Sequence, residues 1–488
     1  MSDVLLTHSY FMHFDPKQEK AMMPYPPLGT LYAAGYLEHF DFSVALFDTM
    51  LADSEQELWT ALHRHHPKLV AIYDDDFNYL NKMCLSRMRE AAFAMAHIAK
   101  QWGAIVIVHG SDATDHAEEY LNHSADVVIV GEGEQTLLEL CQTFIQNKSV
   151  DFELINGVVF KQEETVKRTP KREVQKNLDE LPFPAWHLLE AEPYISEWNK
   201  RHGYVSLNIV TTRGCPYHCN WCAKPIYGQV YNSRSPENVI QEIKLLQMTL
   251  QPDHIWFADD IFGLKPGWVK RFSELIQQEK ISIRFKIQSR VDLLLDAATV
   301  EALAKAGCDE IWVGAESGSQ KILNAMEKGT TVAQIYAVRR MLKKYGIKTA
   351  FFLQFGYLGE EKKDIEATIR MVKDLMPDDL GISVSYPLPG TKFYETVKTQ
   401  LQEKQNWVDS DDLALMFPGT FSPVYYRRLH GYVHKIFRFR KGIQTILDLL
   451  TLKIPFQQSQ LRSIFLTAYF GPLAVIDRVK LAYLERPR

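Results

Sequence analysis

Three cysteines crowded into eight residues constrain this chain more than any other feature. Cys215, Cys219 and Cys222 follow one another with the spacing Cys-x3-Cys-x2-Cys, in a chain of 488 residues that has only six cysteines. Thiolates are soft ligands that suit zinc and iron–sulfur clusters, but a structural zinc site usually needs four protein ligands, two of them from a second pair. The sequence has no second pair. The spacing therefore favours a 4Fe-4S cluster, with one iron open to a small chelating ligand, over a structural zinc loop.

Composition places the chain among soluble globular proteins. Apolar residues make up 46% and charged residues 24% of the sequence, which are ordinary fractions for this class. A net charge of -5 gives no general attraction to nucleic acid, so we do not expect nucleic acid as a partner. The N-terminus lacks a signal-like apolar run and no stretch of about 18 apolar residues occurs, so we expect a cytoplasmic protein. The isolated Cys84, Cys141 and Cys308 are expected to be small apolar core residues.

The first part of the chain alternates short β-branched runs with helical patterns. This order predicts a doubly wound, Rossmann-like parallel sheet at residues 1–145, in which ligands bind beyond the carboxyl ends of the strands. Glycine in the loops at that edge permits close backbone approach to a ligand, or a tight turn before a helix. The run Asp74–Asp76 is typical of a solvated turn and helix N-cap, although its position after a strand also allows ligand contact.

Residues 146–195 predict a connector between two domains. A hairpin is expected over 154–168, and an extended, proline-stiffened linker over 181–186. From 196 to 400 the strand–helix alternation resumes, which predicts a partial (β/α)6 barrel of the TIM type, with polar residues just past each strand facing the active site. The strands are expected at 205–210, directly before the cysteine loop, and at 254–257, 284–288, 310–313, 349–353 and 381–385.

The cysteine run, together with Thr211 to Gly214 before it, resembles the motif of the radical SAM superfamily, in which S-adenosylmethionine (SAM) takes the open iron. The segment Gly314-Ala315-Glu316-Ser317-Gly318 is similar to the Gly-x-Glu-Ser-Gly segment of that superfamily. A Pro-Pro-Leu-Gly segment and a Gly-Glu-Gly-Glu turn, each before a predicted helix, resemble the cobalamin-binding domain of class B radical SAM enzymes. The resemblance covers roughly residues 1–400.

For the N-terminal domain, the resemblance implies cobalamin bound at the glycine loops. The Asp-x-His-x-x-Gly motif, by which some cobalamin proteins supply a histidine to the cobalt, is absent from the sequence. We therefore expect cobalamin without a protein histidine ligand, and the alternative is a domain that has lost its cofactor. The residues expected to contact cobalamin are Pro27, Leu28, Gly29, Asp48, Asp74, Gly110, Gly131, Glu132 and Gly133.

For the barrel, the resemblance implies a SAM-binding site formed by residues that follow the successive strands. A carboxylate beside the methionyl ammonium forms a charge-assisted pair, and an arginine fork holds the methionyl carboxylate. An indole ring offers a flat face to the adenine, although aromatic packing explains it equally well. For each polar residue, a hydrogen bond within the barrel or a helix cap is the alternative. The expected SAM contacts are Trp221, Asp259, Asp260, Arg290, Glu316, Ser317 and Gly356.

Residues 401–488 lose the strand pattern and predict a helical C-terminal domain that caps the barrel. The basic run 427–441 is able to bind phosphate or another anionic group, but such a run is more often a solvated helix face. Residues 460–486 interleave Leu, Ile and Phe with Arg and Lys, which predicts an amphipathic helix over apolar surface. A peripheral contact with a membrane is compatible with the same pattern.

The resemblance predicts a cobalamin-dependent radical SAM enzyme, similar to methyltransferases and to the anaerobic magnesium-protoporphyrin ester cyclase. By that resemblance, an electron donor such as flavodoxin or ferredoxin reduces the cluster, and the reduced cluster cleaves SAM to methionine and a 5′-deoxyadenosyl radical. This radical removes hydrogen from an unactivated carbon. Methylcobalamin then methylates a small-molecule or lipid-like organic substrate. Oxidative cyclisation or rearrangement with the same cofactors is the first alternative.

Two further functions are less well supported by the sequence. A methylthiotransferase would need three more cysteines in the N-terminal domain for a second cluster, and only Cys84 and Cys141 occur there. A cobalamin or redox sensor without catalysis would require a cluster that does not cleave SAM. No residue of the helical C-terminal domain indicates the identity of the substrate.

Overall fold

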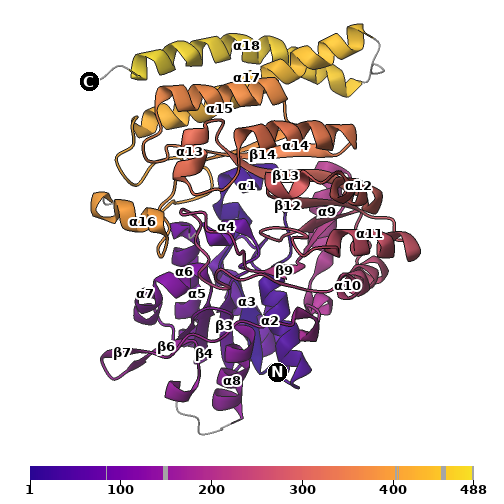
Figure 1. The fold of residues 1–488 in the computed structure, drawn as a ribbon. Coiled ribbons are helices and arrows are strands. Elements are labelled where there is room, and N and C mark those ends of the chain that lie inside the picture. The colour runs from indigo at the N-terminus through magenta and orange to yellow at the C-terminus, as the bar shows by residue number, and fades with distance from the viewer. Residues whose placement is uncertain (84, 147–151, 402–403, 405, 452–457, 486–488) are drawn as a thin grey trace.

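The computed structural model describes the chain except residues 84, 147–151, 402–403, 405, 452–457 and 486–488. Figure 1 shows an N-terminal α/β region in indigo and purple, a second α/β region in colours from magenta to orange, and two long C-terminal helices above them. The expected order of a doubly wound sheet, a partial barrel and C-terminal helices is confirmed.

The first sheet has seven strands in the order β2-β1-β3-β4-β5-β6-β7. Alternate residues of β1 enter two separate cores, Leu5 on one face and Val4 and Leu6 on the other, so helices cover both faces. The strand order reverses beside β1, and β1 and β3 therefore flank the switch point where such sheets bind ligands. The parallel strands are β1 Val4–Thr7, β2 Val44–Phe47, β3 Leu69–Tyr73, β4 Ile105–His109 and β5 Val127–Ile129.

Four longer helices cover this sheet, α3 and α5 on one face and α2 and α8 on the other. Shorter helices lie in the connections. The longer helices are α2 Leu28–His39, α3 Leu58–His65, α5 Ser86–Trp102 and α8 Glu134–Ile145. The shorter ones are α1 Pro16–Ala21, α4 Tyr79–Lys82, α6 Ser111–Asp115 and α7 Ala117–Asn122.

The hairpin expected over 154–168 forms β6 Val158–Gln162 and β7 Thr165–Arg168. Strand β6 pairs antiparallel with β5, so the hairpin extends the first sheet. The linker that follows lies against α2, where the amide of Ala185 donates to the carbonyl of Leu31 at 3.0 Å. A Cβ at Gly35 would stand 2.4 Å from the carbonyl oxygen of Phe183, so α2 accepts the linker only because position 35 has no side chain.

The second sheet has six parallel strands in the order β15-β14-β13-β12-β11-β8, which is the partial barrel expected from the sequence. Ser235 accepts a hydrogen bond from the amide of Asn238 and Pro236 opens α10, as the sequence predicts. The strands are β8 Ser206–Ile209, β11 His254–Phe257, β12 Arg284–Ser289, β13 Cys308–Glu316, β14 Lys348–Phe355 and β15 Asp379–Val384. The helices between them are α10 Pro236–Thr249, α11 Trp268–Gln278, α12 Ala297–Ala306, α13 Gln320–Ala325, α14 Val332–Lys344 and α15 Lys362–Leu375.

The segment before α2 connects the two sheets. Trp198 of α9 (Ala191–His202) donates from its indole nitrogen to the carbonyl of Pro24 at 2.7 Å. The side-chain amide of Asn208 on β8 donates to the carbonyl of Pro26 at 3.0 Å. The ring of Tyr25 packs 4.7 Å from that of Trp256 on β11. The start of α2 is thereby fixed against the first two barrel strands.

The C-terminal part consists of α16 Lys392–Val397, α17 Pro423–Leu450 and α18 Gln458–Leu484. Before α17 the chain returns to the N-terminal domain, where the hydroxyl of Ser410 donates to Asp15 at 2.8 Å. None of the helices in the described ranges is long and apolar enough to cross a membrane. Cys141 and Cys308 are buried, as expected, and Cys84 lies outside the described residues.

Candidate active site

The cysteine loop leaves the barrel at the end of β8 and is closed at its base by a short antiparallel pair. Strand β9 (Thr212–Arg213) pairs with β10 (Asn232–Ser233), and residues 214–231 form the loop between them. Gly214 has a φ of +80°, and a Cβ there would lie 2.4 Å from the carbonyl oxygen of Val230. Only glycine fits this position, so the turn that presents Cys215 depends on it.

Asp259, at the end of β11, holds the base of the loop. Its carboxylate accepts from the amide and hydroxyl of Thr211 at 2.7 Å each, and from the amide and hydroxyl of Thr212 at 2.7 and 2.8 Å. A carboxylate has about four acceptor positions. The group predicted to meet the methionyl ammonium of SAM thus has its acceptor positions taken by the chain itself. Burial raises the pKa of Asp259 to about 6.

Arg213 joins the cysteine loop to the N-terminal domain. The guanidinium is 3% exposed and donates to Glu132, in the loop after β5, and at 2.6 Å to Glu134, the first residue of α8. Burial disfavours the charge of Glu134, but the Arg213 guanidinium outweighs it and holds the pKa of that carboxyl below its ordinary value. The rings of Tyr32, Phe77 and Tyr227 surround the guanidinium at 5.3 to 5.8 Å. Sequence reasoning missed Arg213, and Glu132, a predicted cobalamin contact, meets this arginine.

The three thiols lie close to one another and to Asp260. Burial raises the pKa of Cys215, and burial followed by the negative charge of Asp260 raises the pKa of Cys222 to about 12. Within the described part of the chain, no three His, Cys, Asp or Glu side chains already surround a common point. The fit to a cluster rests instead on the chemistry of the thiols and on the loop that they share. The thiols would release protons on binding a cluster.

Two cations flank the second cysteine of the run. Arg290, after β12, places Nη1 3.8 Å from the Sγ of Cys219 and stacks 3.7 Å over the ring of Tyr217. Lys328 is buried, and its Nζ donates to Oε1 of Glu316 at 2.7 Å. Lys328 could not be found from sequence, because a single lysine in a polar turn after a helix is ordinary. Both cations thus lie near the thiol of Cys219.

The Glu316–Lys328 pair stands at an irregular point of the barrel. Glu316 ends β13 with a φ of +55°, and the pairing of β13 with β14 shifts between Gly314 and Glu316. Lys328 Nζ also lies 5.9 Å from the ring of Trp221. The buried indole nitrogen of Trp221 has no acceptor among the described residues. An unpaired buried donor beside an ion pair is what a polar cofactor would complete, so this group fits SAM.

The other two predicted SAM contacts, Ser317 and Gly356, are bonded to α15 and to the turn before it, respectively. The hydroxyl of Ser317 lies 3.1 Å from that of Thr368. The amide of Gly356 donates to Glu360 at 2.6 Å, and burial raises the pKa of Glu360 to about 8. The structure thus brings Trp221, Arg290 and Glu316 together around the cysteine loop, while Ser317 and Gly356 bond to the helix side of the barrel.

The run Asp74–Asp76 after β3 is buried, so its interpretation as a solvated turn is wrong. Asp74 accepts from the amide and hydroxyl of Ser9 at 2.8 and 2.9 Å. Asp75 accepts from the amide of Gly29 at 2.9 Å, and Asp76 from the hydroxyl of Ser111 at 2.7 Å. Burial raises the pKa of Asp74 and of Asp75 to about 6. The local pattern is polar, but the second domain covers this edge of the sheet.

The glycines predicted to approach cobalamin are packed against protein atoms. A Cβ at Gly110 would lie 2.9 Å from Asp74, one at Gly131 2.9 Å from Lys171, and one at Gly133 2.6 Å from the hydroxyl of Tyr73. Pro27, Leu28 and Gly29 form the start of α2, and Asp48 accepts from the hydroxyl of Tyr194.

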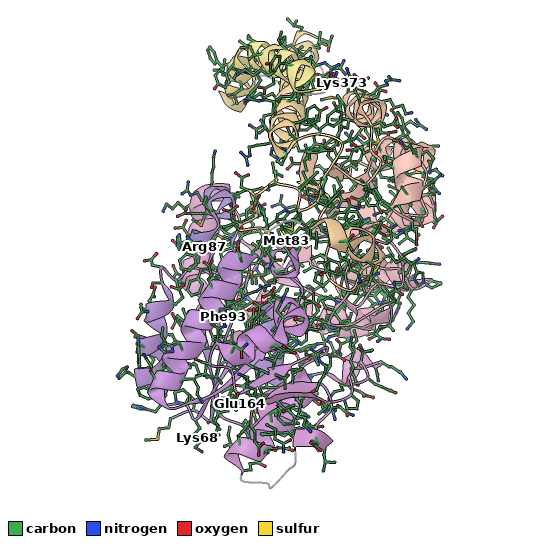
Figure 2. All side chains as sticks on the ribbon, turned by 90° about the vertical axis from the view of Figure 1, so that its left-hand side faces the viewer. Lys68, Met83, Arg87, Phe93, Glu164 and Lys373 are labelled. Atoms are coloured by element: carbon green, nitrogen blue, oxygen red, sulfur yellow. The ribbon has the colours of Figure 1, made fainter. Side chains whose placement is uncertain are left out.

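Unpaired polar atoms at the carboxyl edge of the first sheet suit a bound polar group. Oδ2 of Asp75 and both amide atoms of Asn81, in α4, are buried without a hydrogen-bond partner in the described chain. Figure 2 shows Met83, directly after α4, where the N-terminal domain meets the barrel, far from Lys68 and Glu164. Sequence reasoning missed Asn81, because an asparagine in a short helix carries no pattern.

Comparisons with known proteins agree with this architecture. Residues 209–372, which span the barrel from the cysteine loop to α15, match the radical SAM superfamily. The chain is 28% identical over 389 residues to an uncharacterised methyltransferase of Pyrococcus horikoshii, covering 78% of this chain and 81% of that protein. It is 26% identical over 398 residues to the anaerobic magnesium-protoporphyrin IX monomethyl ester cyclase of Rubrivivax gelatinosus, covering 79% and 69%.

Solved structures share the fold over most of the chain. The cobalamin-dependent S-adenosylmethionine radical enzyme OxsB, with aqua-cobalamin bound, has a TM-score of 0.73 at 18% identity and covers 99% of this chain and 72% of its own. The radical SAM methyltransferase TsrM of Kitasatospora setae, with cobalamin and a [4Fe-4S] cluster, has a TM-score of 0.67 at 18% identity, covering 82% and 75%. The resemblance that the cysteine run and glycine loops indicate is confirmed.

Proposed function

We infer, from a chain that carries a radical SAM domain, that this enzyme binds SAM, a 4Fe-4S cluster and cobalamin and methylates an unactivated carbon of a small-molecule or lipid-like substrate. One observation carries the proposal. Arg213, two residues before Cys215, is bonded to Glu132 in the loop after β5 and to Glu134 at the start of α8. The two predicted cofactor loops, one from each sheet, therefore touch through a single buried side chain.

The metal-binding half of the proposal rests on the cysteine loop. Cys215, Cys219 and Cys222 would hold three irons and leave the fourth to SAM. A cluster bound by three thiolates carries negative charge, and the cations Arg290 and Lys328 beside Cys219 would offset it. This donor set, with no second cysteine pair in the sequence, supports iron over structural zinc.

The proposed SAM site rests on the residues around Glu316. The indole nitrogen of Trp221 is free to donate to an acceptor of SAM. Arg290 and Lys328 would attract the methionyl carboxylate, and Glu316 and Asp260 the methionyl ammonium. Asp259 would act on SAM only indirectly, since its hydrogen bonds fix the loop.

The cobalamin side of the proposal rests on the edge at which β1 and β3 end. Asn81 and Oδ2 of Asp75 supply buried polar atoms without partners there. The relatives TsrM and OxsB were solved with cobalamin, and their fold extends over this domain. We carry Asp74 and Gly29 forward as residues that shape the edge, because both are bonded within it.

When bound, the cluster supplies the electron that splits SAM into methionine and a 5′-deoxyadenosyl radical, and cobalamin supplies the methyl group. The chain contributes position: Arg213 joins the loops, Asp259 fixes the base of the cysteine loop, and Trp221 lies beside Lys328. An external donor of the flavodoxin or ferredoxin class provides the electrons. One SAM is cleaved and another gives up its methyl group, so the by-products are methionine, 5′-deoxyadenosine and S-adenosylhomocysteine.

A second candidate is oxidative cyclisation with the same cofactors. It is favoured by the 26% identity to the anaerobic magnesium-protoporphyrin IX monomethyl ester cyclase. The two candidates differ in the fate of the SAM methyl group. Methylation transfers it to product and forms S-adenosylhomocysteine, whereas cyclisation leaves the label out of the product.

The test is anaerobic reconstitution of the full chain with iron, sulfide and hydroxocobalamin, followed by incubation with dithionite and methyl-deuterated SAM. We expect 5′-deoxyadenosine, and a labelled methyl group in product once a substrate is supplied. An intact cluster that forms no 5′-deoxyadenosine would refute the enzyme proposal. Cys219→Ala should lose iron and cleavage, while Cys141→Ala, a buried cysteine outside the loop, should keep both.

A further inference from the structure

Helix α18 exposes a large apolar surface that its packing does not explain. In Figure 1 this helix forms the outermost layer of the molecule, on the far side of α17 from the barrel. Phe465 is 73% exposed and Val479 is 66% exposed. Monomeric soluble proteins rarely leave such a contiguous apolar patch open without a function. The exposed apolar residues of α18 include Leu461, Phe465, Leu466, Tyr469, Val475, Ile476 and Val479.

These residues form a stripe along one side of the helix. Phe465, Tyr469, Ile476 and Val479 recur at intervals of three, four or seven residues, which places them on a common face. The opposite face is already in use: Asp477 is buried and accepts from Arg428 at 2.9 Å, and Ala474 and Leu481 are buried. The stripe is therefore turned away from the protein by fixed contacts.

Close contact with α17 fixes this orientation further. A Cβ at Gly471 would lie 2.8 Å from the ring of Phe439, so the two helices cross closely there. Asp477 also forms an ion pair with Lys435 of α17. A rotation of α18 that buried the stripe would expose Asp477 and break both of its ion pairs. The apolar face is thus a stable feature of the fold.

The charge of this segment is opposite to that of the rest of the chain. Residues 423–488 hold twelve Lys or Arg and only three Asp or Glu, while the whole chain carries a net charge of -5. Among the described side chains, Arg427, Arg438 and Lys480 are exposed. An apolar stripe within a strongly cationic segment matches the two attractions that hold a helix at an anionic lipid surface, burial of apolar side chains and attraction to acidic headgroups.

A second copy of this chain fits the same surface less well. Two such faces in contact would bring two cationic segments together, and like charges at an interface cost binding energy. An anionic bilayer instead offers opposite charge over an extended plane. We propose that α18 docks the enzyme on an anionic lipid surface, with its axis in the plane of the membrane and Phe465, Tyr469 and Val479 inserted between headgroups.

The experiment is vesicle flotation of the full chain. Vesicles of phosphatidylcholine alone are compared with vesicles of equal parts phosphatidylcholine and phosphatidylglycerol. We expect binding to the mixed vesicles, weaker binding to phosphatidylcholine alone, and a decrease with rising NaCl because the headgroup attraction is screened. Absence of flotation with the mixed vesicles would overturn the proposal.

Variants separate the helix from the rest of the surface. Phe465→Asp and Val479→Asp should each weaken vesicle binding about tenfold, because each removes a large apolar side chain from the contact. Met248→Asp is the matched control, since Met248 is also 73% exposed but lies on α10. All three positions are exposed, so circular dichroism should be unchanged. Equal flotation of Phe465→Asp, Met248→Asp and the parent chain would refute the role of α18. A concentration-dependent dimer lost in Phe465→Asp, with no lipid binding, would assign the face to a second copy instead.

Discussion

Replacing Arg213 by glutamine should destabilise the chain far more than the loss of an ordinary ion pair. The guanidinium is 3% exposed and donates to Glu132 and Glu134, whose carboxylates are buried as well. Removing one partner of a buried ion pair costs about 3–5 kcal/mol, because the remaining charge stays buried without compensation. Two carboxylates would remain here, so we expect a loss of about 5 kcal/mol in the free energy of unfolding.

Arg271 provides the matched control. Its Nε donates to Glu237 at 2.7 Å, but the two side chains are 44% and 49% exposed. Exposed pairs of this kind contribute about 0–1 kcal/mol. Arg271→Gln should therefore lower the free energy of unfolding by less than about 1 kcal/mol. Urea unfolding followed by tryptophan fluorescence measures both, from the shift of the midpoint at unchanged slope.

The pH dependence tests the cause. In Arg213→Gln, the pKa of Glu134 in the folded chain should rise above its unfolded value, and that of Glu132, which burial already raises, should rise further, because no cation opposes the effect of burial. The folded state then binds more protons than the unfolded state, so the deficit should shrink as the pH falls from about 7 toward 5. Equal midpoint shifts for the two variants at neutral pH, or a deficit independent of pH, would refute the reasoning.

Three other changes give direct readouts. Gly214→Ala should lower the iron content after reconstitution, because its Cβ would meet Val230 at 2.4 Å; iron analysis at parent-like circular dichroism decides this. Lys328→Met should weaken SAM binding about tenfold by leaving Glu316 buried without its partner, and an unchanged dissociation constant in equilibrium dialysis would contradict it. The Glu360 carboxyl has a folded pKa of about 8, raised by burial, so its contribution to stability is lost as the pH rises from about 5 to 8. Glu360→Gln should remove that part of the pH dependence of Tm, and parallel Tm curves would exclude it.

The strands and helices of both sheets could be predicted because their signals are local. The start of α10 at Ser235 and Pro236 is an example, since the cap and the first turn are read from adjacent residues. The pairing of β6 with β5 could not be predicted, because a hairpin that pairs internally gives no sign of the sheet it will extend. The alternating pattern indicates which residues of a strand share a face, but tertiary packing decides which other strand it pairs with.

The candidate site was predictable where a motif carried it. The three cysteines and Glu316 stand in runs with recognisable spacing. Arg213 and Lys328 could not be found in that way, because their partners Glu134 and Glu316 lie 79 and 12 residues away. The burial of Asp74–Asp76 was missed for a related reason: polarity in one segment does not report that another domain covers it.

The four hydrogen bonds to Asp259 decide how much of the cysteine loop a cluster would have to order. Thr211 and Thr212 are held by that carboxylate with no contribution from any metal, so the base of the cysteine loop forms together with the barrel. A zinc finger, by contrast, is unfolded until its metal binds. Here the base of the loop is held by hydrogen bonds within the polypeptide. A cluster would complete the loop without having to order its base, so that part of the site is built into the barrel rather than into the metal.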